Sequence, residues 1–332
     1  MEKDSFKKSK TNQDEIKVSI SCLTYNHEKY IRKCLDGFVN QKTDFKFEVL
    51  IHDDASTDGT ADIIKEYEQR YPDIIKPIYQ TENQYSKGVK LSAVYQYPRV
   101  KGKYFAICEG DDCWIDPNKL QKQYDFLEKN PEYSTCVHCA IFHSVSDDKD
   151  TIVPEIAEDV DITIEDSILG GGSLVATNSI MRRTEQVFSK PSCFEAIGFG
   201  DYQEIIHSAI CGKIRCFADV MSLYNCGTEG SWTSRVWNYP NKRIEVYKEK
   251  IRMLKCVDEY YEYKYHEPFE KKILIDEYQM NILLGNYKQC LSKKYRFIFK
   301  GLSTKGKLYV VLSAFFPGII DIYKKRFAKH EQ

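Results

Sequence analysis

Several features that would assign this sequence to a class at once are missing from it. The segment from Met1 to Lys17 is polar and charged and contains no apolar stretch of the signal-peptide type, so we expect a cytoplasmic protein. The 48 Lys and Arg nearly balance the 49 Asp and Glu, and this net charge of -1 disfavours a globally basic nucleic-acid-binding protein. The sequence also has no G-x-G-x-x-G motif, no internal repeat and no low-complexity segment.

The 12 cysteines lack the arrangement of a metal site. The only Cys-x-x-Cys is formed by Cys136 and Cys139, and no second pair of ligands follows at the spacing that structural zinc requires. In a reducing compartment we expect the cysteines to be thiols. The pattern over residues 133–142 therefore favours a buried strand whose cysteines serve as small apolar side chains.

The first part of the sequence alternates between apolar strands and amphipathic helices. We expect strands over residues 17–23, 47–51, 74–79 and 104–108, with helices between them, one of which covers residues 89–100. This order predicts an α/β fold with a mainly parallel sheet flanked by helices. Acidic residues follow two of these strands, where α/β sheets bind ligands. They are Asp53, Asp54, Glu109, Asp111 and Asp112.

The second part of the sequence is less regular. Residues 146–166 are acidic and typical of a loop, residues 173–181 and 214–224 favour strands, and a helix is expected from Asp201 onward. From about Lys242 the pattern is helical. The sequence therefore predicts a disordered polar tail over residues 1–16, an α/β domain over 17–240, and a basic, C-terminal helical extension over 241–332.

Two pairs of adjacent aspartates could carry chemistry. Asp111 and Asp112 repel each other unless a cation, hydrogen-bond donors or solvent compensate them. Mg²⁺ or Mn²⁺ bound together with a substrate diphosphate would do so, and a solvated turn is the alternative. Asp53 and Asp54 could accept hydrogen bonds from a nucleotide, but taken alone they favour a cap for the following helix. A near-match to a phosphate-binding loop at residues 301–307 lacks the final Ser or Thr and favours a basic loop.

Three motifs occur together in a recognisable order. Residues 18–35 read VSISCLTYNHEKYIRKCL, residues 49–60 read VLIHDDASTDGT, and residues 108–120 read CEGDDCWIDPNKL. They resemble the opening, the second motif and the metal-binding acidic motif of family-2 glycosyltransferases, which have the GT-A (Rossmann-like) fold, in particular the bacterial surface-polysaccharide type. The resemblance covers about residues 17–232 and is strongest up to residue 142.

The resemblance implies a nucleotide-sugar donor, most often a UDP-sugar, and a divalent metal ion. By motif match, Tyr25 would stack on the base, Asp53 would accept a hydrogen bond from the base imide, and Asp111 would contact the ribose. Asp112 would bind the metal ion that bridges the diphosphate. Such an ion offsets the charge that builds on the departing nucleoside diphosphate.

An inverting transferase of this family also needs a general base for the acceptor hydroxyl. The carboxylate that matches by motif is Asp201, at the start of a predicted helix, where it could equally serve only as an N-cap. Glu195 and Glu204 are the alternatives.

Two tryptophans leave similar choices open. Residues 224–232 resemble a family loop that closes over donor and acceptor, so Trp232 would offer an apolar face to the acceptor sugar or else pack within the protein. Trp114 lies beside the acidic motif and is open to the same two interpretations.

The C-terminal segment is strongly basic, because residues 288–329 hold eleven Lys or Arg and one acidic residue. The apolar run over residues 308–320 contains Pro317 and is too short to span a bilayer, which needs about 20 residues. Basic residues beside apolar and aromatic ones suit a helix on an anionic membrane surface. A helical subdomain packed on the catalytic domain is the alternative.

Together these features predict an inverting, metal-dependent, hexosyltransferase-like glycosyltransferase. It would move a sugar from a nucleotide-sugar to a hydroxyl of a growing surface glycan, with a lipid-linked acceptor at the inner membrane face as one setting. Two rival functions stay open. A nucleotidyltransferase making activated sugars is disfavoured because residues 23–28, after the first strand, contain no glycine. A non-catalytic assembly subunit is disfavoured because Asp111 and Asp112 are both present.

Overall fold

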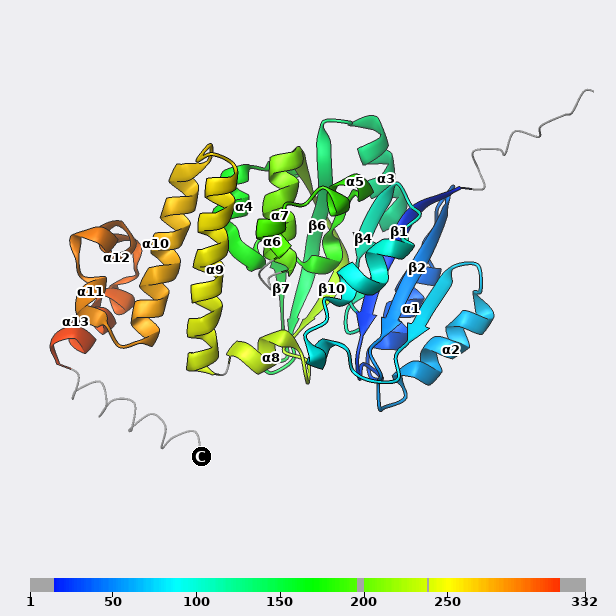
Figure 1. Cartoon of the computed structure of the whole chain (residues 1–332), viewed down its shortest axis with the longest axis horizontal. Coiled ribbons are helices and arrows are strands. Elements are labelled where there is room, and N and C mark those ends of the chain that lie inside the picture. The colour runs from blue at the N-terminus through cyan, green and yellow to red at the C-terminus, as the bar shows by residue number, and fades with distance from the viewer. Residues whose placement is uncertain (1–14, 196–199, 238, 317–332) are drawn as a thin grey trace, which may run out of the picture. The chain divides into compact units, whose positions relative to one another are not determined.

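The computed structural model describes residues 15–195, 200–237 and 239–316, and these form two compact units (Figure 1). The first unit takes the described residues up to 190 together with 200–228. The second takes the described residues from 191 to 195 and from 229 onward. The predicted polar tail lies outside the described residues up to residue 14, as does the end of the C-terminal extension from residue 317.

The first unit is built on one sheet. In the described residues its strands follow the order β3-β2-β1-β4-β9-β6-β10-β5, with β7 beside β6 and β8 beside β10. Four neighbours are parallel: β3 (Ile75–Tyr79), β2 (Lys46–Asp53), β1 (Ile16–Thr24) and β4 (Tyr104–Ile107). The two long strands β6 (Tyr133–Ser144) and β10 (Lys213–Cys226) are also parallel. Antiparallel pairs are made by β5 (Cys113–Trp114), β7 (Lys149–Val153), β8 (Val160–Ile162) and β9 (Met181–Arg183).

The predicted α/β architecture is confirmed, and the antiparallel pairs lie in its second half. Helices of this unit are α1 (Ile31–Val39), α2 (Thr60–Arg70), α3 (Lys119–Lys129), α4 (Ile164–Gly170), α5 (Thr184–Phe188) and α7 (Gly200–Cys211). Short 3-10 or π turns are η1 (Tyr85–Lys87), η2 (Ser92–Gln96), η3 (Tyr97–Arg99), η4 (Gly171–Ser173) and η5 (Thr177–Ser179).

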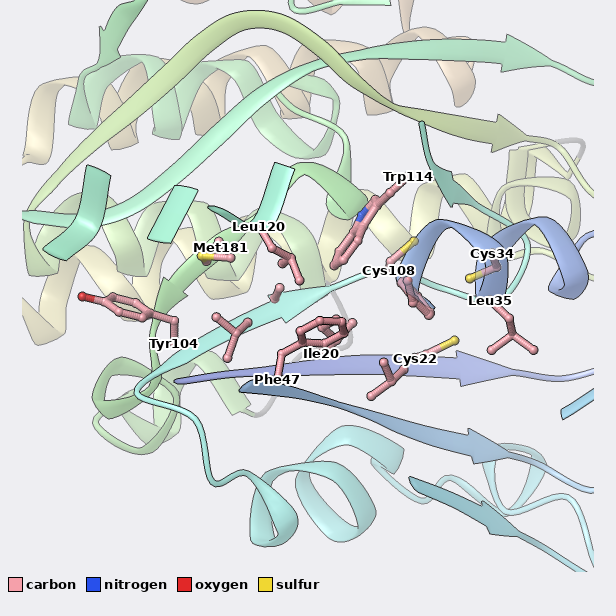
Figure 2. Packing of buried hydrophobic residues seen from close by; sticks show 14 of the residues in the cluster. Ile20, Cys22, Cys34, Leu35, Phe47, Tyr104, Cys108, Trp114, Leu120 and Met181 are labelled. Carbon is pink, nitrogen blue, oxygen red and sulfur yellow. The ribbon is translucent and has the colours of Figure 1, made fainter. Parts of the chain in front are cut away.

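The main hydrophobic core lies between the sheet and helices α1 and α3. Alternate residues of β1, such as Val18, Ile20 and Cys22, are fully buried on this side, as the period of two predicts. Figure 2 shows Ile20 and Cys22 among Leu35 and other labelled side chains of the cluster. Cys136 and Cys139 are buried free thiols in β6, which confirms their prediction as apolar strand residues.

Three local predictions need correction. The helix expected over residues 89–100 is shorter and irregular, with a π-helix over Ser92–Gln96 followed by a 3-10 turn over Tyr97–Arg99. Gln96 turns inward and donates to the carbonyls of Cys22 and Leu50. The strand expected over residues 173–181 is mostly 3-10 turns, and only β9 remains of it. The acidic segment 146–166 contains β7, β8 and the start of α4 in place of a continuous loop.

Side-chain hydrogen bonds explain why residues 177–179 do not form a strand. Trp114 Nε1 donates to the carbonyl of Asn178 over 2.8 Å, and Gln123 Nε2 donates to that of Ser179 over 2.9 Å. These buried side chains satisfy backbone groups that a neighbouring strand would otherwise satisfy. Trp114 is 3% exposed, so it packs within the protein and does not offer a face to a sugar.

The second unit is helical, as predicted for the C-terminal region. It contains α6 (Ser192–Glu195), α8 (Trp232–Trp237), α9 (Pro240–Tyr260), α10 (His266–Leu283), α11 (Tyr287–Cys290), η6 (Lys293–Tyr295), α12 (Arg296–Gly301) and α13 (Thr304–Phe315). Residues 301–307, expected as a basic loop, are the end of α12 and the first turn of α13, which Ser303 caps. Over the described residues, every helix is too short or too polar to cross a membrane.

Candidate active site

The predicted nucleotide-binding residues come together because three parallel strands end at one edge of the sheet. Tyr25 directly follows β1, Asp53 is the last residue of β2, and the acidic motif with Asp111 and Asp112 follows β4. Tyr25 is 43% exposed, whereas the three aspartates are buried. The strand register therefore places one open aromatic side chain and several carboxylates at the same edge.

Asp53 links the loops that follow β1 and β2. Both of its oxygens accept hydrogen bonds from Ser56, one from the hydroxyl and one from the backbone N–H. The Ser56 hydroxyl oxygen in turn accepts from the N–H of Asn26 over 2.9 Å. Burial raises the pKa of Asp53. The carboxylate thus has a fixed orientation at the strand end.

Neither Asp53 nor Asp54 caps the following helix, so that interpretation of the pair is wrong. Helix α2 begins after Gly59, and Asp58 accepts the N–H and hydroxyl hydrogen bonds of Thr60 at its start. Asp54 instead accepts from the N–H groups of Gln84 at 2.8 Å and Tyr85 at 3.0 Å. It therefore holds the loop after β3 against the site.

The acidic motif is held by the end of β10. The N–H of Asn225 donates to Oδ1 of Asp112 over 2.9 Å, and its side-chain amide donates to the carbonyl of Asp111 over 2.6 Å. Thr228 Oγ1 donates to Oδ2 of Asp111 over 2.8 Å. Each aspartate thus has one oxygen engaged by this segment. Among the described residues, no donor contacts the other oxygen of either carboxylate.

Thr24, the last residue of β1, and His27, in the loop after it, pack closely against the acidic motif. A Cβ on Gly110 would lie 2.6 Å from Thr24 Oγ1 and 2.9 Å from His27 Nδ1, so only glycine allows this approach. His27 Nε2 lies 3.9 Å from Oδ2 of Asp111. Burial lowers the pKa of His27, and the charge of Asp111 opposes this. The contact brings a potential cation beside the aspartate when His27 is protonated.

Four carboxylates lie close enough to Tyr224 of β10 for their charges to act on its hydroxyl group. The pKa of Tyr224 is raised by burial first and then by the charges of Asp112, Glu109, Asp201 and Asp111. Burial also raises the pKa of Asp112 well above its ordinary value, with the charge of Asp111 as the next cause. The site therefore concentrates negative charge where little water solvates it.

Glu109 belongs to the same group. Its side chain reaches solvent, but protein surrounds it closely enough to reduce the solvation of its carboxylate. The reduced solvation is the largest cause, and the charges of Asp111 and Asp201 follow; together they raise the pKa of Glu109 to about 8. A cation at this site would relieve the repulsion.

Asp201 lies in the first turn of α7. Its Oδ1 accepts from the N–H of Tyr202 over 2.7 Å, and burial raises its pKa. The glycine-rich turn before β9 passes directly beside it, because a Cβ on Gly172 would lie 3.3 Å and 3.4 Å from the two carboxylate oxygens. Gly171 precedes this contact with φ +70° and ψ -162°, a conformation open essentially only to glycine.

The alternatives to Asp201 differ in their surroundings. Glu204 is buried and forms ion pairs with Arg182 and Lys190, so its charge is already engaged. The side chain of Glu195 lies outside the described ones, and so does that of Trp232, the first residue of α8.

The donor set fits a divalent cation that is completed by a substrate. In the part of the chain that the structure describes, no group of three or more His, Cys, Asp or Glu is arranged to hold a metal ion. Asp112 has one unengaged oxygen in a region of raised carboxylate pKa values. Mg²⁺ and Mn²⁺ are commonly bound by one or two carboxylates together with substrate phosphates, and this arrangement suits that mode.

Sequence reasoning missed several residues of this site. Tyr224, Asn225 and Thr228 were assigned only to a closing loop, although they hold the acidic motif. His27 and Gly172 were not singled out. The pairing of Trp114 with Ser222 on β10, which brings these segments together, leaves no local signal in the sequence.

Comparison with known proteins agrees with the geometry. Residues 19–168 match the profile described as glycosyl transferase family 2. This segment, a little under half of the chain, is similar to that family. An uncharacterized protein of Mycobacterium tuberculosis is 36% identical over 218 residues, which are 65% of this chain and 61% of that protein. A poly(ribitol-phosphate) beta-glucosyltransferase of Bacillus spizizenii is 33% identical over 118 residues, 35% of this chain and 18% of that protein.

The chain spans less than two thirds of the length of these two relatives. Among solved structures, S. aureus TarS 1-349 in complex with UDP-GlcNAc has a TM-score of 0.54 and 17% identity, covering 90% of this chain and 87% of TarS. The mannosyltransferase PcManGT from Pyrobaculum calidifontis, in complex with GDP-Man and Mn²⁺, has a TM-score of 0.51 and 16% identity, covering 90% and 86%. These similarities establish the GT-A fold.

Proposed function

We propose that this protein is an inverting glycosyltransferase that moves a sugar from a nucleotide-sugar to a hydroxyl group of a surface glycan. The observation that carries the proposal is the buried acidic motif, in which Asn225 and Thr228 each fix one oxygen of Asp112 and Asp111. The charges of Glu109 and Asp201 act on Tyr224 together with those of this motif. Such a group suits two tasks at once, namely stabilising a departing diphosphate through a cation and accepting a proton from the attacking hydroxyl.

The donor is a nucleotide-sugar whose base carries an imide N–H. The open ring of Tyr25 stacks on the base, and Asp53, held by Ser56, accepts the imide hydrogen bond. This acceptor favours uracil, thymine or guanine over cytosine, which has no N–H at the corresponding ring position. We assign UDP-sugars as the donor class. TarS, with a similar fold, was solved with UDP-GlcNAc, and PcManGT with GDP-Man, so the fold alone does not fix the base.

Asp112 would hold a divalent cation together with the donor diphosphate, and Asp111 would contact the ribose. When bound, the cation supplies charge neutralisation for the nucleoside diphosphate as it leaves. The chain's own part is to fix both aspartates through Asn225 and Thr228. This fixed geometry removes the need to reorganise the site as charge develops.

Asp201 takes the proton of the acceptor hydroxyl. A raised pKa makes its carboxylate a stronger base than an ordinary aspartate, which improves proton transfer at neutral pH. Trp232 is the residue that the family resemblance assigns to the acceptor sugar. A lipid-linked acceptor would place the transfer at the cytoplasmic face of a membrane.

The proposal is tested by supplying UDP-, GDP-, CDP- and dTDP-sugars with Mn²⁺ and measuring released nucleoside diphosphate with and without glycan acceptors. We expect diphosphate release from a UDP-sugar, accelerated by one acceptor. A nucleotidyltransferase would instead consume a nucleoside triphosphate and a sugar phosphate and release pyrophosphate. A protein that binds nucleotide but turns over none of these donors, with any acceptor, would be a non-catalytic subunit.

A further inference from the structure

Helix α13 of the second unit has one buried face and one open apolar face. Val310, Ser313 and Ala314 are buried, and Val310 joins the small core that includes Tyr278 and Tyr295. Tyr309 also contacts α11, since its hydroxyl lies 3.0 Å from that of Tyr287. These contacts fix which side of the helix faces its own unit.

The opposite side carries large apolar side chains. Leu308, Val311, Leu312 and Phe315 recur at spacings of three and four residues, which places them along one face. Leu308 is 58% exposed and Phe315 is 60% exposed, and the next residue, Phe316, is 55% exposed. A helix that is apolar on both sides needs a second apolar environment.

The charges around this face have one sign. Residues 284–316 contain seven Lys or Arg and no Asp or Glu. Lys305 and Lys307 lie in the first turn of α13, at the two borders of the apolar face by helical geometry. Long cationic side chains at the border of an apolar helix face suit the headgroup level of an anionic bilayer.

We propose that the face of α13 formed by Leu308, Val311, Leu312 and Phe315, with Lys305 and Lys307 at its borders, docks on an anionic lipid bilayer. The helix lies along the surface, since its twelve residues are too few to span the apolar layer. Phe315 and Leu308 enter the boundary between headgroups and acyl chains, and the lysines contact the phosphates. Binding to a bilayer in this way does not depend on the transfer reaction, and it localises the chain at the lipid surface.

The test uses the full chain and its co-sedimentation with vesicles. We expect binding to vesicles of phosphatidylcholine with phosphatidylglycerol, little binding to phosphatidylcholine alone, and weaker binding at high salt because the charges are exposed. Leu308→Ser with Phe315→Ser should weaken binding about tenfold or more, by removing the apolar contribution. Lys305→Glu with Lys307→Glu should weaken it by a similar factor, on the anionic vesicles only.

Matched controls come from the first unit. Phe188 is 62% exposed, so Phe188→Ser removes an equally open aromatic ring, and Lys129→Glu with Lys149→Glu reverses two exposed charges. Both controls should bind vesicles as the wild type does, and all variants should bind nucleotide normally. The proposal is overturned if the folded full chain does not bind anionic vesicles, or if the control variants lose as much binding as the α13 variants. It is also overturned if the effect of Phe315→Ser is to abolish a dimer detected by light scattering.

Discussion

The backbone N–H of Asn225 donates a 2.9 Å hydrogen bond to Oδ1 of Asp112, across 113 residues of sequence. This bond joins the end of β10 to the acidic motif after β4 and fixes one carboxylate oxygen while the other stays open. The chain thereby presents a buried carboxylate of raised pKa in a defined orientation.

Asp201→Asn should abolish transfer without weakening donor binding. The amide oxygen can still accept from the N–H of Tyr202, so the fold should be kept, while the proton acceptor is lost. We expect kcat to fall by about 10²-fold or more, as for loss of a general base. The measurement is single-turnover transfer beside nucleotide titration. Asp219→Asn, at a surface ion pair with Lys122, is the control and should leave both values unchanged.

Gly172→Ala should weaken transfer through Asp201. The new Cβ would lie 3.3–3.4 Å from both carboxylate oxygens and crowd the path of an acceptor hydroxyl. We expect kcat to drop about tenfold, since a small misplacement of reacting groups has large effects. Gly301→Ala, whose Cβ would meet no atom within 4 Å, should have no effect. If Gly172→Ala is as harmful in Asp201→Asn as in the wild type, the two residues do not act together.

Tyr25→Ala should weaken nucleotide binding, and Tyr25→Phe should not. An exposed aromatic ring stacks on a base regardless of its hydroxyl, and loss of one such stack costs about 1–3 kcal/mol. We therefore expect about a tenfold rise in the dissociation constant for the alanine variant by calorimetry. Tyr260→Ala removes a similarly exposed ring from α9 and serves as the control. Equal affinities for wild type and Tyr25→Ala would exclude the stacking role.

Lys119→Met should change how stability depends on pH. Lys119 is fully buried with its ammonium 3.8 Å from the centre of the Trp114 ring, and burial lowers its pKa from 10.5 to about 7. Between these pH values the unfolded chain binds more protons, so the free energy of unfolding rises with pH.

From pH 7 to pH 9 the wild type should therefore gain about 2 kcal/mol relative to Lys119→Met. Urea unfolding of both proteins at the two pH values measures this difference. Lys129→Met, at the end of the same helix, should show the same change in the free energy of unfolding between the two pH values as the wild type. A constant difference between wild type and Lys119→Met would mean that Lys119 does not titrate in this range.

Local patterns predicted the parallel half of the sheet and its edge residues. Val18, Ile20 and Cys22 alternate in β1. Asp53 ends β2 and Asp112 comes shortly after β4, so each of them can be placed from a single strand and the residues at its end. The path from residue 173 to β9 could not be predicted, because it depends on donors such as Trp114 that come from distant segments. The same holds for the support of Asp112 by Asn225.

The glycine-rich turn beside Asp201 shows the same limit. Three consecutive glycines at residues 170–172 are typical of a flexible turn, whereas their contact with Asp201 forms only when α7 packs beside them. The resemblance to a family supplied the roles of Tyr25 and Asp201. From composition and spacing alone, both a binding role and a structural role are possible for each of these two residues.

We propose that Asp112 binds the donor diphosphate through a divalent ion. Calorimetric titration of UDP into wild type and Asp112→Asn, each with and without Mn²⁺, measures this role. We expect tight binding only for the wild type with Mn²⁺, and at least tenfold weaker binding in the variant, with Asp116→Asn behaving as the wild type. Equal UDP affinity with and without Mn²⁺, or full Mn²⁺-dependent binding by Asp112→Asn, would contradict the account.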